Sequence, residues 1–280
     1  MIKIFVDSGS SIKQEEKEKY GVEIIPLRIS IGNKEYIDGV NLPMSKFYSS
    51  LIDEKIFPKT SLPSLGETEQ KVKKALDNGD EVIIITISSE ISGTYRTFKM
   101  MFADEKRVRV IDSKSAVGGI RLLVIEALKY LDCDLDFVEK KLLDLVPRIC
   151  VVAVPETLEY LCRGGRLSKT SYIIGSILQL KPLITLDSAD GKVKVLAKER
   201  GIRRATQAVA SALIKYECDE NYPIVPSYTY NVENLKTLIS ITDEKYKKQM
   251  IEFDHLDPAI ACHWGPNAFG YIFISNKKEI

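Results

Sequence analysis

The run from Glu81 to Ile87 is the feature that most constrains the fold of this chain. Its residues, Glu-Val-Ile-Ile-Ile-Thr-Ile, are nearly all apolar, and it lies between the turn formers Asn78-Gly79 and the polar pair Ser88-Ser89. β-Branched residues favour strands, and a short strand without polar alternation is buried on both faces. The run therefore indicates a parallel sheet covered by helices on both sides.

Other segments of the first half agree with this prediction. Apolar strand patterns at residues 2–6 and 108–111 alternate with helical patterns at residues 65–78, 116–130 and 137–146. The run from Val22 to Ile31 also has strand composition, and Pro26 predicts a bend within it. We expect an α/β domain over residues 1–147.

The second half begins with another apolar strand, and Pro147 just before it marks the expected domain boundary. Residues 149–154 and 181–186 have strand composition, and the alternating residues 192–197 are expected to pair with the latter as a hairpin. Amphipathic helices follow at residues 202–216 and 232–241. We expect residues 148–280 to form an α+β domain with a mixed sheet, and 280 residues suffice for two such domains.

Composition argues against several classes of function. The formal net charge of +1 gives no general attraction for nucleic acid. The five cysteines form no C-x-x-C pair and there are two histidines, so we expect neither a metal site nor a disulfide framework. The N-terminus lacks the pattern of a signal peptide and no apolar run has the length of a membrane span. We expect a cytoplasmic monomer without a cofactor.

Polar residues follow three of the predicted strands, at Asp7-Ser8, Ser88-Ser89 and Asp112-Ser113. Ligands of open α/β sheets bind outside the carboxyl ends of the strands, so these residues could mark a site. The alternative is that Asp and Ser are there because they end strands and cap helices.

Two hydroxyl-rich segments are the strongest candidates for an anion site. In Thr60-Ser61-Leu62-Pro63-Ser64, Ser64 and Glu67 have the spacing of a capping box, so Ser64 is predicted to cap the next helix. Hydroxyls and helix N-terminal amides together can hold a carboxylate or phosphate. In Ser92-Gly93-Thr94, the glycine permits close approach of a ligand to the backbone. Polar helix caps without a ligand are the alternative for both segments.

The second half adds three features with structural alternatives of their own. Arg163-Gly164-Gly165-Arg166 is either an exposed functional loop or a helix C-cap. The nearly all-apolar run of residues 172–180 is either core or the lining of a cavity. His263 is either a core histidine or a partner for an anion.

These motifs, taken in order, resemble the DegV family of bacterial fatty-acid-binding proteins. The matches are Thr60-Ser61-x-Pro63-Ser64, Ser88-Ser89-x-x-Ser92-Gly93-Thr94, Gly164-Gly165-Arg166 with Ser168, Lys181-Pro182, and His263-x-Gly265-Pro266. They extend over nearly the whole chain.

The resemblance implies a two-domain fold, with an N-terminal three-layer α/β/α domain and a C-terminal two-layer α/β domain with a mixed sheet, meeting over a lipid tunnel. It implies a non-enzymatic protein that holds a long-chain fatty acid and presents it to a fatty acid kinase for acyl-phosphate formation. The implied carboxylate ligands are Thr60 and Ser92, with Ser61, Gly93, Thr94 and His263 close by. Arg166 is implied in docking the kinase and could also lie near the head group.

The sequence departs from the family pattern in places. Asn267 replaces a usual glycine, Tyr228 stands where a histidine is common, and Cys262 and Trp264 are bulkier than usual neighbours of His263. These departures bear on the length of the acyl chain. We expect Ile174, Leu178 and Leu183 to line the acyl chain, because residues 172–180 and the strand of Leu183 and Ile184 are apolar.

Two other functions fit parts of the sequence. A serine-dependent hydrolase would use Ser92 or Ser61 as nucleophile and His263 as base, but the chain has no G-x-S-x-G elbow. A protein that binds sugars or phosphates would share the anion site but would not need an apolar channel.

Overall fold

The computed structural model describes residues 1–167, 180–252 and 255–277. The predicted apolar runs of the first half form a parallel sheet in the order β2-β1-β6-β7. Its strands are β1 (Ile2–Asp7), β2 (Val22–Ile25), β6 (Glu81–Thr86) and β7 (Val108–Asp112). They are nearly fully buried, as expected for a parallel sheet with both faces covered.

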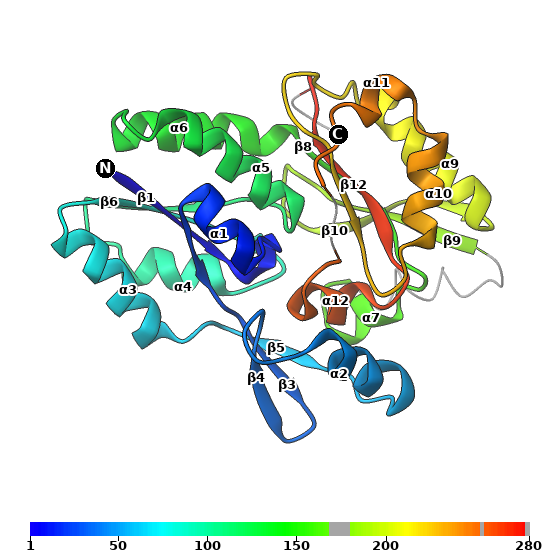
Figure 1. Cartoon of the computed structure of the whole chain (residues 1–280), viewed down its shortest axis with the longest axis horizontal. Helices are drawn as coiled ribbons and strands as arrows, with labels where there is room; N and C mark the ends of the chain where they lie inside the picture. The colour runs from blue at the N-terminus through cyan, green and yellow to red at the C-terminus, as the bar shows by residue number, and fades with distance from the viewer. Residues whose placement is uncertain (168–179, 253–254, 278–280) are drawn as a thin grey trace.

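Helices cover both faces of this sheet, which gives the expected three-layer arrangement (Figure 1). One face packs on α3 (Leu65–Asp77) and α4 (Thr94–Met101). The other packs on α5 (Gly118–Ala127) and α6 (Leu135–Leu145), with α1 (Gln14–Tyr20) beside β2. Ser64 caps α3, as predicted, by accepting a hydrogen bond from Glu67 N at 3.5 Å.

The second half forms a five-stranded sheet in the order β10-β9-β8-β12-β11. Its strands are β8 (Ile149–Val154), β9 (Leu180–Leu186), β10 (Val193–Arg200), β11 (Val225–Tyr228) and β12 (Phe269–Ile274), and β9 and β10 form the predicted hairpin. These strands pair antiparallel throughout. Among the described residues, parallel pairing in this sheet is limited to isolated bridges at Ile224 and Tyr228.

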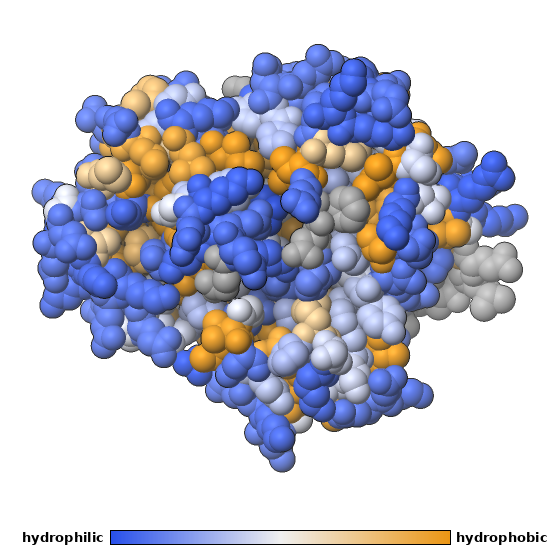
Figure 2. All heavy atoms as spheres, viewed as in Figure 1, coloured by the Kyte–Doolittle hydropathy of each residue, from blue (hydrophilic) through white to orange (hydrophobic). Residues whose placement is uncertain are grey.

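Two helices, α9 (Ile202–Lys215) and α10 (Glu233–Ile241), cover one face of this sheet and give the second half its two layers. The short α11 (Glu244–Lys247) follows α10. In Figure 2, hydrophilic residues predominate over the outer helices of both halves, while hydrophobic residues gather below α6. No helix among the described residues is both long and apolar enough to span a bilayer.

A third, small sheet has the order β4-β3-β5. The Gly32-Asn33 dipeptide predicts its β3–β4 hairpin, whereas no feature of the sequence predicts that β5 joins it. The chain bends at Pro26, so that the predicted strand splits into β2 and β3 (Arg28–Ile31). β4 (Lys34–Ile37) returns through a Gly32-Asn33 turn in which Gly32 has φ +58°, and β5 (Lys59–Ser61) pairs with the other edge of β3. In this sheet β5, the strand that contains Thr60, contacts residues 258–264 of the second half (Figure 1).

Short helices complete the described fold. They are α2 (Met44–Tyr48), the π-helical η2 (Ser49–Asp53), α7 (Glu159–Arg163), α12 (Pro258–Trp264), and the 3-10 segments η1 (Ser8–Ser10), η3 (Leu128–Tyr130) and η4 (Val146–Arg148).

The two halves share one hydrophobic core through α5, which contacts β6 on one side and β8, β11 and β12 on the other. The approach is close at Gly118, where a Cβ would lie 2.7 Å from the Val225 side chain. η4 leads directly from α6 into β8. One hydrophobic cluster thus extends across both halves, so the packing of the core does not separate two domains at residue 147. The division into domains at this residue stays a prediction.

Candidate functional site

A cavity of about 210 Å³ is lined by residues that follow β6 and by residues of β5, α12 and the β9–β10 hairpin. Its walls come from both halves of the chain. The described residues that line it are Leu27, Thr60, Ser61, Leu62, Ile87, Ile91, Ser92, Gly93, Ala116, Val151, Leu161, Arg166, Ile184, Thr185, Leu186, Val193, Ala259, Ile260, His263 and Trp264.

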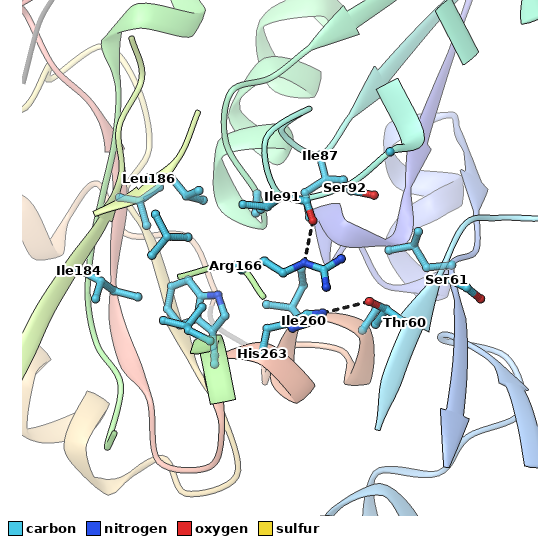
Figure 3. A pocket seen from close by; sticks show the side chains of 18 of the residues that line it. Thr60, Ser61, Ile87, Ile91, Ser92, Arg166, Ile184, Leu186, Ile260 and His263 are labelled. Carbon is cyan, nitrogen blue, oxygen red and sulfur yellow. Dashed lines mark hydrogen bonds between the residues drawn. The ribbon is translucent and has the colours of Figure 1, made fainter. Parts of the chain in front are cut away.

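Thr60 and His263 meet in this cavity although 203 positions separate them in the sequence. Thr60 Oγ1 lies 2.9 Å from His263 Nε2, and Figure 3 shows this hydrogen bond at one end of the pocket. β5 supplies Thr60 and α12 supplies His263, and these two elements pack directly on each other. The structure thus brings together two of the residues predicted for the site.

His263 is a neutral imidazole in this fold. Burial, with a smaller contribution from the Arg166 charge, lowers the pKa of His263 to about 3. A neutral imidazole has one donor nitrogen and one acceptor nitrogen. Nε2 contacts Thr60, whereas Nδ1 is buried and has no hydrogen-bond partner among the described residues.

Gly164 explains how the buried His263 ring fits. A Cβ at Gly164 would lie 2.2 Å from His263 Nδ1, so that only glycine leaves room for the ring. Gly164 is also the C-cap of α7, and Gly165 beyond it has φ +74°. Of the two alternatives for this segment, an exposed functional loop or a helix C-cap, the Gly-Gly motif is therefore a helix C-cap. The same motif also makes room for His263.

Arg166 lies on the wall of the cavity, close to His263 (Figure 3). Its Nε donates to the Ile91 carbonyl at 2.8 Å and its Nη1 donates to the Gly164 carbonyl. Burial lowers the pKa of Arg166, because the guanidinium is partly removed from water. Among the described lining residues there is no aspartate or glutamate, so the charged part of this cavity is cationic.

The hydroxyl segment after β6 contributes Ser92 and Gly93 to the cavity. Gly93 is the N-cap residue of α4, so this helix, rather than α3, begins at the cavity wall. Thr94 is fully buried and is not among the lining residues, but its Oγ1 lies 2.8 Å from Ser92 Oγ. Thr94 therefore supports Ser92 instead of reaching the cavity.

Ser61 also borders the cavity, but it is exposed, and in Figure 3 its hydroxyl points away from Thr60 and His263. Successive side chains of a strand point to opposite sides, so β5 cannot aim both hydroxyls at one point.

The prediction for Leu183 was wrong. Leu183 packs in the separate cluster under α9, while its neighbours Ile184 and Leu186 line the cavity. The alternation of side chains along β9 places Leu183 and Ile184 on opposite faces of the sheet. Ile174 and Leu178, the other two predicted lining residues, lie outside the described residues, as does Ser168.

Several lining residues went unrecognised in the sequence. Ile87 and Ile91 flank the serine pair after β6, and Ile260 lies on the same helix as His263. The alternation of β9 and β10 could have indicated Leu186 and Val193. The remaining apolar residues carry no local feature that separates cavity lining from core.

The polar residues at the ends of β1 and β7 have structural roles. Asp7 accepts hydrogen bonds from the amides of Gly9 and Ile87 at 2.9 and 2.8 Å, which ties the end of β1 to that of β6. Asp112 accepts a hydrogen bond from Ser89 N at 3.1 Å. None of these residues lines the cavity, so here the capping alternative holds. The part of the chain that the structure describes holds no cluster of potential metal ligands.

The sequence matches known proteins along its length. The model of the family described as "uncharacterised protein, DegV family" matches residues 1–276. A DegV domain-containing protein of Caldanaerobacter subterraneus subsp. tengcongensis is 36% identical over 208 residues, 73% of each chain. A DegV domain-containing protein of Clostridium acetobutylicum is 29% identical over 280 residues, which cover 97% of this chain and 98% of that protein.

Solved structures share the fold over the whole chain. A fatty-acid-binding DegV family protein of Streptococcus agalactiae has a TM-score of 0.88 and 25% identity, with 99% of each chain covered. A DegV family protein of Thermus thermophilus, described for its fatty acid binding, has a TM-score of 0.86 and 26% identity over 98% of this chain and 99% of that one.

Proposed function

The chain belongs to the DegV family, and from that premise we propose that it binds a long-chain fatty acid non-covalently in the cavity between its sheets. Thr60 and Ser92 hold the carboxylate, with Gly93 and His263 beside them and Thr94 behind Ser92. The acyl chain extends along the apolar side chains of Ile184, Leu186 and their neighbours.

The observation that carries this proposal is the division of the cavity into a polar and an apolar part. Thr60, His263 and Arg166 lie together on one side, and Ile184 and Leu186 lie across from them (Figure 3). A fatty acid has one anionic group and one long apolar tail. The polar part of the cavity suits the anionic group, and the apolar part suits the tail.

The neutral state of His263 leaves the Thr60 hydroxyl free to donate a hydrogen bond to a ligand. A buried N–H without an acceptor is less well tolerated than a bare lone pair, so we assign the proton to Nε2. Nε2–H then donates to Thr60 Oγ1. The Thr60 hydroxyl proton is thereby left to donate into the cavity, where a carboxylate accepts it.

Energetics support the same ligand. Burial of a carboxylate is costly unless hydrogen bonds and an opposite charge compensate. Ser92, Thr60 and the half-buried Arg166 offer that compensation. The tail contributes roughly 0.8 kcal/mol for each buried CH₂ group, so most of the affinity comes from the acyl chain.

The further steps of this function are also proposals. The protein acts in the cytoplasm as a monomer and is not itself an enzyme; it presents the bound acid to a fatty acid kinase, which forms the acyl phosphate. Arg166 is proposed to couple the bound head group to that partner, because it reaches the cavity and remains partly accessible.

The hydrolase alternative fits the geometry less well. His263 Nε2 contacts Thr60, while Ser92 Oγ pairs with Thr94 Oγ1. A general base works best with a pKa near the working pH, whereas the pKa of His263 is lowered to about 3. No carboxylate among the described residues orients Nδ1.

Native mass spectrometry of the purified protein, with lipid extraction, tests the proposal. We expect a co-purifying species with the mass of a long-chain fatty acid, and a rise in the thermal midpoint when fatty acid is added to delipidated protein. The matching fatty alcohol, which lacks the anion, should give a smaller rise. Absence of both the co-purifying lipid and the thermal shift would refute fatty acid binding.

A further inference from the structure

A second pocket, of about 430 Å³, lies between α2–η2 and the end of β11. It shares no described lining residue with the first cavity. Its described lining residues are Met44, Ser45, Tyr48, Ser49, Ile52, Asp53, Tyr228, Tyr230 and His255.

Aromatic rings form a large part of its walls. The rings of Tyr48 and Tyr230 have centroids 4.8 Å apart and are inclined by 54°. The rings of Tyr228 and His255 lie 6.5 Å apart, inclined by 64°. Tyr48 is buried and packs on Tyr230, whereas Tyr230 is exposed, so the Tyr230 ring is the most accessible of these aromatic groups. The face of an aromatic ring carries partial negative charge.

The charged residue of the described lining is negative, like the faces of the aromatic rings. Asp53 is acidic, and no lysine or arginine occurs among the described lining residues. Burial raises the pKa of Tyr48, so this hydroxyl stays neutral. The hydroxyl of Tyr48 accepts a hydrogen bond from Tyr230 N at 2.8 Å, which fixes the two tyrosines relative to each other.

The backbone on both sides of the pocket is unusual. η2 is a π-helix, a conformation that is rare and often occurs at functional sites. Tyr230 has φ +57°, an unfavourable value for an aromatic residue, and the residue is 54% exposed. This conformation holds an accessible ring against the pocket, where a ligand can reach it.

We propose that this pocket binds a small organic cation of the quaternary ammonium class. Trimethylammonium groups bind to aromatic faces through cation–π attraction and cannot donate N–H hydrogen bonds, so they need no buried acceptor. Asp53 adds a countercharge. An anion would meet the negative ring faces and Asp53 without a lysine or arginine of the described lining to compensate.

Isothermal titration calorimetry at pH 8 tests the proposal with choline and with 3,3-dimethylbutan-1-ol. The alcohol has the shape of choline with carbon in place of the charged nitrogen. We expect choline to bind at least tenfold more tightly than the alcohol. Equal affinities, or no binding of choline up to about 50 mM, would overturn the proposal.

Two variants of one residue separate ring chemistry from packing. Tyr230→Phe keeps the π-face and should bind choline within about threefold of the parent protein, whereas Tyr230→Leu should lose at least fivefold. Asp53→Asn should also weaken choline but leave the alcohol unchanged. An unchanged thermal midpoint, and an unchanged response to fatty acid, would show that these variants remain folded. If Tyr230→Leu binds choline like the parent, the aromatic site is wrong.

The trimethylammonium group could come from a free metabolite or from a lipid headgroup. Co-sedimentation with phosphatidylcholine vesicles, with phosphatidylglycerol vesicles as control, distinguishes the two sources. We expect free choline to bind without vesicle co-sedimentation, because the aromatic walls enclose a single small group. Sedimentation with phosphatidylcholine that choline competes away would identify the headgroup as the ligand of the same site.

Discussion

Gly164 lies directly against the ring of His263, and a Cβ at this position would come within 2.2 Å of Nδ1. Gly164 itself has ordinary helical dihedral angles, φ −72° and ψ −9°. Position 164 therefore requires glycine because any larger residue would collide with the ring of His263, which in turn contacts Thr60.

Gly164→Ala should displace the His263 ring and break its hydrogen bond to Thr60. We expect a loss of about 1–3 kcal/mol in the free energy of unfolding, as for other overpacked sites, and at least a tenfold loss in fatty acid affinity. Urea unfolding and a fluorescent fatty acid displacement assay measure the two effects. Gly66→Ala is the matched control, because no atom lies within 4 Å of its Cβ position. Equal behaviour of the two variants would contradict the role given to Gly164.

The two hydroxyls proposed to bind the carboxylate can be removed separately. Thr60→Val and Ser92→Ala should each weaken fatty acid binding by about 1–3 kcal/mol, the cost of leaving a buried charge-assisted hydrogen bond unmade. Ser61→Ala should change it by less than about 0.5 kcal/mol, because Ser61 is exposed and points away. Affinities from titration calorimetry decide this. Unchanged binding in both Thr60→Val and Ser92→Ala would refute the head-group site.

Substitutions of the adjacent residues Leu183 and Ile184 of β9 should have different effects on fatty acid binding. Leu183→Ala should cost about 2–5 kcal/mol of stability through a cavity in the core under α9. Its thermal shift on adding fatty acid should match that of the parent protein. Ile184→Phe should instead fill the acyl cavity and reduce the shift for long chains more than for short ones. A chain-length effect in Leu183→Ala but not in Ile184→Phe would reverse this assignment of faces.

Asp38 should make stability depend on pH. Burial, together with the Asp257 charge, raises the pKa of the Asp38 carboxyl to about 7. Between pH 4 and 7 the folded state therefore binds more protons than the unfolded state. The free energy of unfolding that Asp38 contributes therefore falls as the pH rises through this range. Asp38→Asn lacks the ionisation and keeps an oxygen for the Ala259 amide.

The free energy of unfolding of Asp38→Asn, relative to the parent protein, should thus increase from pH 4.5 to pH 8, by roughly 1–4 kcal/mol. Urea unfolding at several pH values measures the difference. A difference that stays constant over this range would show that Asp38 does not titrate in this window.

Arg166→Ala should separate lipid binding from delivery. Two of the guanidinium's donors are already used by the Ile91 and Gly164 carbonyls, so we expect lipid affinity within about tenfold of the parent protein. Acyl-phosphate formation by a fatty acid kinase should be lost. Arg163→Ala is the control, since Arg163 is exposed and pairs with Glu159. A loss of lipid affinity above about a hundredfold would instead make Arg166 a direct head-group ligand.

The departures from the family pattern can now be interpreted physically. Asn267 has φ +61°, and asparagine is among the few residues other than glycine that adopt this conformation readily. Trp264 lines the cavity proposed to hold the fatty acid, whereas Tyr228 belongs to the second pocket. Trp264 is therefore the departure that bears on the acyl chain.

The sequence by itself determined the strands of the parallel sheet, the cap of α3, the β9–β10 hairpin and the order of the motifs. These follow from backbone preferences and side-chain periodicity, which act over a few residues. The tertiary structure alone decided that Thr60 meets His263, that α4 rather than α3 begins at the cavity, and that Ile184 rather than Leu183 faces it. Such contacts depend on the path of the chain between distant segments and on which face of a strand a second layer covers, and no local pattern encodes either.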